Sequence, residues 1–349
     1  METNIIMNEE QVSVARQPHL AEKVAFIDGL GGCGKTMLSP IISALDRVEL
    51  LTYAYEIEHI CSLHYLGKID NDAARMMVRM LTDLQLYNSM MSREINFRPG
   101  DLSSVFRDAK PLRYLRRLFQ KGDKAIPEIV SMERPILNLT THNLLAFSEP
   151  IFSALGDRAV FIEVVRHPLY MVRQEALNME SVVADVRDFT VYFDYKGRQL
   201  PYYISGWEEL FLSSNAVDKA IYYIDKLTKL TEIAKTRLKK EYNAQILTVS
   251  FESFVTGPGP YIEKIGHLLG TKATAITRRM MKKQNVPRKM YADGIGLKVY
   301  KRCGWEPPKS SNEEGEFALR RKFAAEHSSS NAMQVLDQLC KDYEDQYLK

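Results

Sequence analysis

The feature of this sequence with the clearest chemistry is a glycine-rich run that ends in lysine and threonine, Gly29–Thr36. It fits the pattern G-x-x-x-x-G-K-[ST] in full. Glycines let consecutive backbone N–H groups turn toward one anion, and a following helix N-terminus and the Lys35 ammonium add positive charge. The apolar run Val24–Asp28 precedes it and predicts a buried strand, and Met37–Ala44 has helical character. This context predicts a site for a phosphate or a phosphate-like group, formed by Gly31, Gly32, Cys33, Gly34, Lys35 and Thr36.

Two further polar residues follow predicted strands. Arg166 ends the apolar run 159–165, where an arginine is suited to binding a second phosphate through bidentate hydrogen bonds. His142 follows the run 136–140 and is expected to face the same crevice as the phosphate loop, where it can take a proton from an attacking hydroxyl. Structural roles stay open for both: an ion pair of Arg166 with a carboxylate such as Glu163, and a helix-capping or buried polar role for His142.

A basic stretch near the C-terminus is the third candidate. The segment 264–292 contains no acidic residue and eight basic ones, namely Lys264, Lys272, Arg278, Arg279, Lys282, Lys283, Arg288 and Lys289. A solvated surface and a loop that closes over a charged nucleotide both fit this composition.

The elements that position these residues alternate along the chain. Strands are predicted at 24–28, 136–140, 159–165 and 246–250, with helical segments between them and a long amphipathic helix from Asp218 to Tyr242. The pattern predicts an α/β fold: three layers, α/β/α, around a mostly parallel central sheet.

Two segments depart from that alternation. The segment of about 49–133 is longer than a crossover needs and is predicted to be an inserted helical cap. Within 187–207, Tyr195-Lys196-Gly197-Arg198 predicts a hairpin turn or a mobile flap. We predict a flexible N-terminal lead-in over 1–22 and a single domain over 23–349.

Composition narrows the classes of protein. The chain has 349 residues, of which 45% are hydrophobic, and its 47 basic and 44 acidic residues leave a net charge of +3, too even for nucleic-acid binding through global charge. No run of about 18 apolar residues predicts a transmembrane segment. The four scattered cysteines favour neither a disulfide scaffold nor a cysteine zinc site and fit a reducing cytosol, so a cytoplasmic location is expected.

In their order and spacing, these pieces resemble the sulfotransferases that use 3′-phosphoadenosine-5′-phosphosulfate (PAPS). The resemblance extends from about Lys23 to Trp305. It covers the phosphate loop, Thr140-Thr141-His142-Asn143, the strand that leads to Arg166-His167-Pro168, the long helix, Ser250-Phe251-Glu252-Ser253-Phe254 and Gly266-His267-Leu268-Leu269-Gly270. It implies sulfuryl transfer from PAPS to a hydroxyl or amine of a carbohydrate, lipid or small molecule.

The resemblance also implies roles. The loop from Gly31 to Thr36 would hold the 5′-phosphosulfate, Lys35 would neutralise the leaving phosphate, and His142 would be the general base. The 3′-phosphate would be held by Arg166, and Gln174 stands where the family often has a serine as the second ligand of that phosphate. The late basic residues Arg278, Arg279 and Arg288 would match the family's late nucleotide-binding loop. No metal is implied.

Two other classes stay open at this point. A P-loop kinase or NTPase that uses Mg-ATP or Mg-GTP is favoured by the complete Gly-Lys-Thr, because Thr36 would be the usual magnesium ligand, but no acidic residue cleanly ends a neighbouring strand. A non-catalytic nucleotide-binding protein on the same fold is the other.

The oligomeric state is not predicted. A cluster formed by Arg113, Arg116, Arg117, Lys121 and Lys124 fits either a solvated helix face or a site for an acidic glycan or lipid headgroup.

Overall fold

A parallel sheet of five strands runs through the centre of the protein. The computed structural model describes residues 12–181, 188–292 and 312–348. All neighbouring strands pair in parallel, in the order β2 (Thr52–Tyr53), β3 (Leu137–Thr140), β1 (Val24–Asp28), β4 (Ala159–Val165) and β7 (Gln245–Ser250). The predicted parallel α/β sheet and its four predicted strands are confirmed. Strand β2 was not predicted, because two residues are too few to show a period.

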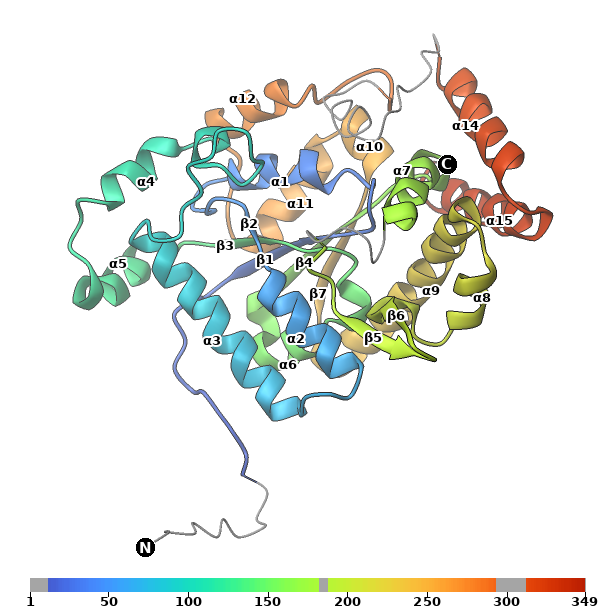
Figure 1. The fold of residues 1–349 in the computed structure, drawn as a ribbon. Coiled ribbons are helices and arrows are strands. Elements are labelled where there is room, and N and C mark those ends of the chain that lie inside the picture. The colour runs from blue at the N-terminus through green and yellow to red at the C-terminus, as the bar shows by residue number, and fades with distance from the viewer. Residues whose placement is uncertain (1–11, 182–187, 293–311, 349) are drawn as a thin grey trace, which may run out of the picture.

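Helices cover both faces of the sheet and complete three layers (Figure 1). Side chains alternate along β1, so that Ala25 and Ile27 join one buried cluster and Val24 and Phe26 join the other. The first cluster is closed by α1 (Lys35–Ser43) and α11 (Gly259–Leu269), and the second by α2 (Tyr55–Tyr65), α3 (Asn71–Met90) and α6 (Glu149–Leu155). Because β1 is buried on both faces, its sequence is a continuous apolar run.

The helical segment after α1 is only partly a cap. Helices α2 and α3 are part of a layer on the sheet, and β2 is part of the sheet itself. What stands beyond the layers is the chain around α4 (Pro111–Arg117), which Figure 1 shows beside the β2 edge. Helix α5 (Ile126–Glu133) buries Ile126 and Val130 in the same cluster as α2 and α3. The predicted insertion over 49–133 is therefore mostly core structure.

The N-terminal lead-in is anchored rather than flexible over 12–22. The Asp83 carboxylate accepts hydrogen bonds from the backbone N–H groups of Leu20 and Ala21 and forms an ion pair with Arg16 at 2.8 Å. The N–H of Val14 donates to Asp72. The expectation of a flexible lead-in was wrong for these residues, and 1–11 lie outside the described part. Because both acids belong to α3, this segment is held by a helix that follows it by some sixty residues, which local composition cannot reveal.

Most of the remaining helices gather at the β7 side of the sheet, namely α7 (Pro168–Ser181), α8 (Glu208–Ser213), α9 (Ala216–Tyr242), α10 (Phe251–Thr256), α14 (Glu313–His327) and α15 (Ser330–Tyr347). Helix α12 (Ala275–Lys283) instead packs against α1. Short 3-10 turns lie at Val105–Arg107, Asp123–Ala125, Leu145–Phe147, Gly156–Arg158 and Tyr202–Ile204. Among the described helices, none has the length and apolar character to cross a bilayer.

The predicted hairpin is confirmed. Its strands are β5 (Tyr192–Tyr195) and β6 (Arg198–Pro201), which pair antiparallel. The turn residues Lys196 and Gly197 both have positive φ, at 52° and 77°, as a two-residue hairpin turn requires.

Helix α4 is held to the fold by a buried carboxylate. Arg117 donates to both Glu49 oxygens, at 2.7 and 3.1 Å, Arg113 lies 3.1 Å from Oε1, and the Tyr114 hydroxyl donates to Oε2 at 2.8 Å. Burial alone would raise the pKa of Glu49, but Arg113 and Arg117 outweigh it and lower that pKa to about 2. The pairing therefore needs the ionised carboxylate.

We predict that Glu49→Gln destabilises the protein by about 3 kcal/mol at pH 7, because the buried Arg117 keeps only the half-exposed Glu133 as a countercharge. The pKa is 4.5 for an ordinary Glu and about 2 in the fold, so the stabilisation is complete above pH 4.5 and is lost as pH falls toward 2. Urea unfolding at pH 7 and pH 3 measures both effects. The difference between variant and parent should shrink at pH 3, and Glu128→Gln, an exposed acid on α5, is the control. A difference that does not depend on pH would contradict this role.

Candidate functional site

The phosphate loop lies between β1 and α1 at the carboxyl end of the sheet, packed against its neighbours more closely than side chains would allow. A Cβ atom on Gly31 would lie 1.8 Å from Oε1 of Glu175, and one on Gly34 would lie 2.2 Å from the Phe251 ring. Gly34 also has a φ of 101°, which L-residues rarely adopt. The glycines are therefore required by packing as well as by the turn.

Lys35 is the first residue of α1 and lies almost wholly buried against the loop. Its Nζ donates to the carbonyl oxygens of Gly29, at 2.9 Å, and Leu30, at 3.3 Å. No side chain caps the N-terminus of α1, so the positive end of the helix dipole faces the loop. The next residue, Thr36, is exposed. The lysine and the helix terminus together concentrate positive charge where the loop turns.

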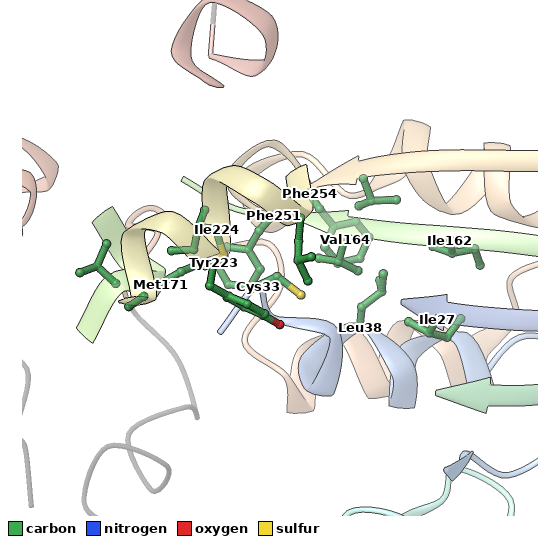
Figure 2. Close-up of a cluster of buried hydrophobic side chains, with 14 of the residues drawn as sticks. Ile27, Cys33, Leu38, Ile162, Val164, Met171, Tyr223, Ile224, Phe251 and Phe254 are labelled. Carbon is green, nitrogen blue, oxygen red and sulfur yellow. The ribbon is translucent and has the colours of Figure 1, made fainter. Parts of the chain in front are cut away.

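Cys33 turns its side chain into the core. Figure 2 shows it among Val164, Ile224 and Phe251 in the larger hydrophobic cluster, and it is 1% exposed. Burial is the main cause that raises the pKa of its thiol. Cys33 can therefore serve an anion only through its backbone, and its side chain anchors the loop.

Arg166 lies beside the loop, as its position after β4 predicted. Its Nη1 donates to the Gly32 carbonyl at 3.0 Å, and its guanidinium lies 4.7 Å from the Tyr170 ring centroid and 4.2 Å from that of Phe251. Its Nε is buried, has no hydrogen-bond partner among the residues that the structure describes, and lies 4.0 Å from Oε1 of Glu252. The alternative, an ion pair of Arg166 with a local carboxylate, is thus found with Glu252 and not with Glu163, whose carboxylate binds Lys235 and Thr248.

Arg288 is the one late basic residue of the predicted set that reaches this place. Its guanidinium lies 5.2 Å from the Phe251 ring centroid, so Phe251 is bordered by both Arg288 and Arg166. Arg278 and Arg279 are exposed on α12. Thr277 binds the carbonyl of Ala44, at the C-terminal end of α1, whereas the phosphate loop precedes the N-terminus of that helix. The structure does not bring Arg278 and Arg279 to the loop.

Helix α7 supplies two polar side chains to the loop. A Cβ on Gly32 would lie 3.2 Å from Oε1 of Gln174, which confirms that Gln174 is next to the loop. Glu175, beside Gly31, is 2% exposed and accepts a hydrogen bond from Asn178 at 3.3 Å. Burial raises the pKa of Glu175 to about 7, against the opposing effects of Asn178 and Lys35. A carboxyl group that holds its proton near neutral pH thus lies behind the anion site.

His142 lies at the end of β3 and is paired with a carboxylate from α2. Its Nδ1 lies 3.0 Å from Oε1 of Glu58, which also accepts from the His142 backbone N–H at 2.9 Å. The rings of Tyr53 and Tyr55 lie near-parallel to the imidazole, with centroids 5.7 and 5.9 Å away. With Nδ1–H donated to Glu58, Nε2 is the nitrogen that can accept a proton. The buried alternative is wrong, since the His142 side chain is 39% exposed. The helix-capping alternative is wrong too, because Asp28 accepts from the N–H groups of Leu144 and Leu145 at the turn that follows.

Several carboxylates near the strand ends are already bound by the protein. Asp28 accepts from the Thr141 hydroxyl and from the N–H groups of Leu144 and Leu145. Glu252 accepts from the Tyr343 hydroxyl and the His167 N–H. Within the described ranges, no group of three or more His, Cys, Asp or Glu side chains is arranged to hold a metal ion.

Three residues of this site were not predicted from the sequence. Phe251 follows directly on the strand run 245–250 and so had a positional signal, and Glu175 is next to Gln174 in the chain. Glu58 had none, because it precedes His142 by 84 residues and the contact depends on how α2 packs.

Comparison with known proteins finds similarity at the level of structure. No family model matches the chain, and no curated protein matches it. Sulfotransferase STF9 from Mycobacterium avium aligns over 94% of this chain and 77% of its own, with a TM-score of 0.41 and 13% identity. The sulfotransferase domain from the curacin biosynthetic pathway aligns over 89% and 99%, with a TM-score of 0.41 and 11% identity. That from the Synechococcus PCC 7002 olefin synthase aligns over 90% and 98%, with a TM-score of 0.38 and 13% identity. At such TM-scores and identities the function has to be argued from this chain's own residues.

We predict that Glu175→Gln makes the protein more stable than the parent, and that this difference grows as pH rises from 4.5 to 7. The pKa is 4.5 for an ordinary Glu and about 7 in the fold, so the native state keeps a proton that the unfolded chain has lost. The parent therefore loses stability between pH 4.5 and 7, by about 3 kcal/mol in all, and the loss is complete above pH 7. Urea unfolding should show the variant and the parent equal near pH 4.5 and the variant more stable at pH 8. Equal pH dependence of the two would refute the buried proton.

Proposed function

We propose that this protein is a sulfotransferase that transfers a sulfuryl group from PAPS to a hydroxyl or amine. The observation that carries the proposal is the approach of both Arg166 and Arg288 to the ring of Phe251, which packs on Gly34 of the phosphate loop. A second cationic site beside the loop suits a nucleotide with phosphates at two separate places, as PAPS has on its 5′ and 3′ oxygens.

The residues present fit the donor. Positive charge from Lys35 and the α1 terminus supports binding of the 5′-phosphosulfate at Gly31–Thr36. The buried Nε of Arg166, which has no hydrogen-bond partner in the described part of the chain, supports a role on the 3′-phosphate with Arg288. Gln174 borders the loop at Gly32 and offers a neutral hydrogen bond. When bound, PAPS supplies an activated sulfuryl group whose leaving group is a phosphate.

Three side chains would carry the chemistry. Lys35 Nζ would neutralise the charge that grows on the leaving phosphate. His142 Nε2 would take the proton of the acceptor, with Glu58 holding the imidazole through Nδ1. Glu58 is thus a positioning residue, since it acts through His142.

The acceptor is proposed to be a small molecule or a glycan. The near-parallel rings of Tyr53 and Tyr55 beside His142 give the acceptor an apolar surface. The described cysteines Cys33, Cys61 and Cys340 are free and buried, which supports a reducing compartment, and we propose the cytoplasm.

The alternative of a Mg-dependent kinase or NTPase has less support. Thr36 is exposed and available to a metal, but a Mg-nucleotide site also needs an acidic ligand at the end of a neighbouring strand. The acids near those strand ends, Asp28 and Glu252, already accept hydrogen bonds from backbone N–H and hydroxyl groups. A non-catalytic role is disfavoured by the accessible His142 paired to Glu58.

We predict that Arg166→Ala weakens binding of 3′-phosphoadenosine-5′-phosphate by about 10- to 100-fold, the cost of one or two charged hydrogen bonds. Binding of AMP, which lacks the 3′-phosphate, should fall no more than a few-fold. Calorimetric titration measures both, and Arg237→Ala, a half-exposed arginine on α9, is the control. Equal losses for the two nucleotides would mean that Arg166 only supports the loop at Gly32.

We predict that His142→Ala lowers kcat by about 10²- to 10⁴-fold while donor binding is unchanged, because the base is lost and the phosphate site is not. Glu58→Gln should lower kcat less and also leave donor binding unchanged. Initial rates with saturating PAPS, together with titration of the bisphosphate, separate the two effects. A fully active His142→Ala variant would exclude it as the base.

A further inference from the structure

Helix α4 has its apolar and polar faces reversed. A surface helix ordinarily buries apolar side chains and exposes charged ones. Helix α4 instead buries Tyr114 and Arg117, at 0% and 3% exposure, on Glu49. Its outward side chains, with that of its C-cap residue and the next, are large and apolar: Leu112 at 62% exposure, Leu115 at 38%, Leu118 at 48% and Phe119 at 90%. We call these four the α4 apolar ridge.

The ridge is not a random scatter of surface apolar groups. Single exposed apolar residues are common on proteins, but a contiguous set marks an interaction surface. The ion pairs of Arg113 and Arg117 with Glu49 fix which way the helix faces, so the ridge cannot turn inward without breaking both pairs and leaving the buried Glu49 carboxylate without a cation. Figure 1 shows α4 at the outer margin of the molecule, beyond the β2 edge of the sheet. The fold therefore holds the ridge toward the outside.

The surroundings of the ridge are cationic. Arg116, Lys121 and Lys124 are exposed, and none of them forms an ion pair with another described residue. The acidic residue between them, Asp123, is engaged by Arg93 and by the hydroxyl of Tyr87. A ligand for this surface has to be apolar at the ridge and anionic around it.

We propose that the α4 ridge and the turn that follows it, Leu112–Lys124, dock the protein on a bilayer that contains anionic lipid. Leucine and phenylalanine beside arginine and lysine are what an interfacial helix presents to the acyl boundary and the headgroups. Each basic residue near an anionic surface adds attraction to the headgroups, and the ridge adds apolar burial. A second copy of this chain is disfavoured as the occupant, since a symmetric contact brings the three unpaired cations of each copy together. The inference does not depend on the proposed sulfotransferase activity.

Co-sedimentation of the full chain with vesicles tests the proposal. Vesicles of phosphatidylcholine with phosphatidylserine should bind the parent at least tenfold more tightly than phosphatidylcholine alone, and salt should weaken that binding. The double variant Leu115→Ser/Phe119→Ser and the charge variant Arg116→Glu/Lys121→Glu should each lose at least tenfold. The matched control is Ile233→Ser/Lys239→Glu, which changes exposed residues on α9 and should bind like the parent.

Folding and competing occupants are checked in the same preparation. All four altered positions point outward, so the variants should keep the parent's Tm. The Phe119→Trp variant reports contact with lipid through its added tryptophan. After the parent's emission spectrum is subtracted, the remaining emission should shift to shorter wavelength when anionic vesicles are added. Equal binding of parent and ridge variants, or no binding of the parent, overturns the proposal. So does a dimer in sedimentation velocity without lipid that the ridge variants abolish, because it would assign the ridge to a second copy.

Discussion

The site depends on how closely the phosphate loop is packed. Glu175 approaches Gly31 and the Phe251 ring approaches Gly34 to distances that no side chain on the loop would permit. The guanidinium groups of Arg166 and Arg288 both lie against the Phe251 ring, so the ring that packs on the loop also places a second cationic group of residues beside it. Cys33 fastens the same turn from within the core. The phosphate site and its neighbour are thus one packed unit.

The rest of the fold brings other chemistry to the same edge. Parallel strands end together, so β1 delivers the loop, β3 delivers His142, β4 delivers Arg166 and β7 delivers Phe251. Helix α2 covers the opposite face of the sheet and contributes Glu58 to His142. The histidine and the arginines therefore reach one edge through different strands, and the proposed proton transfer and anion binding fall to different side chains.

What could be predicted follows from the range of each interaction. The strands, the loop and the position of Arg166 were visible because continuous apolar runs and glycine spacing are local signals. The roles of Glu58, Asp83 and Glu49 were not, because each is decided by a contact between distant segments. The extent of the inserted cap was overestimated for the same reason: α2 and α3 are long and amphipathic whether they cover a sheet or stand apart, and β2 is only two residues. Arg278 and Arg279 share the basic stretch with Arg288, and composition could not tell which residue faces the loop.

The most direct test of the central claim compares nucleotides on the unaltered protein. Calorimetry with 3′-phosphoadenosine-5′-phosphate in the absence of divalent metal should give micromolar binding, because Lys35, Arg166 and Arg288 supply the charge that the two phosphates need. Mg-ATP and Mg-GTP should bind at least tenfold more weakly. Tight, metal-dependent binding of a triphosphate together with weak binding of the bisphosphate would contradict the account and favour phosphoryl transfer at Lys35 and Thr36.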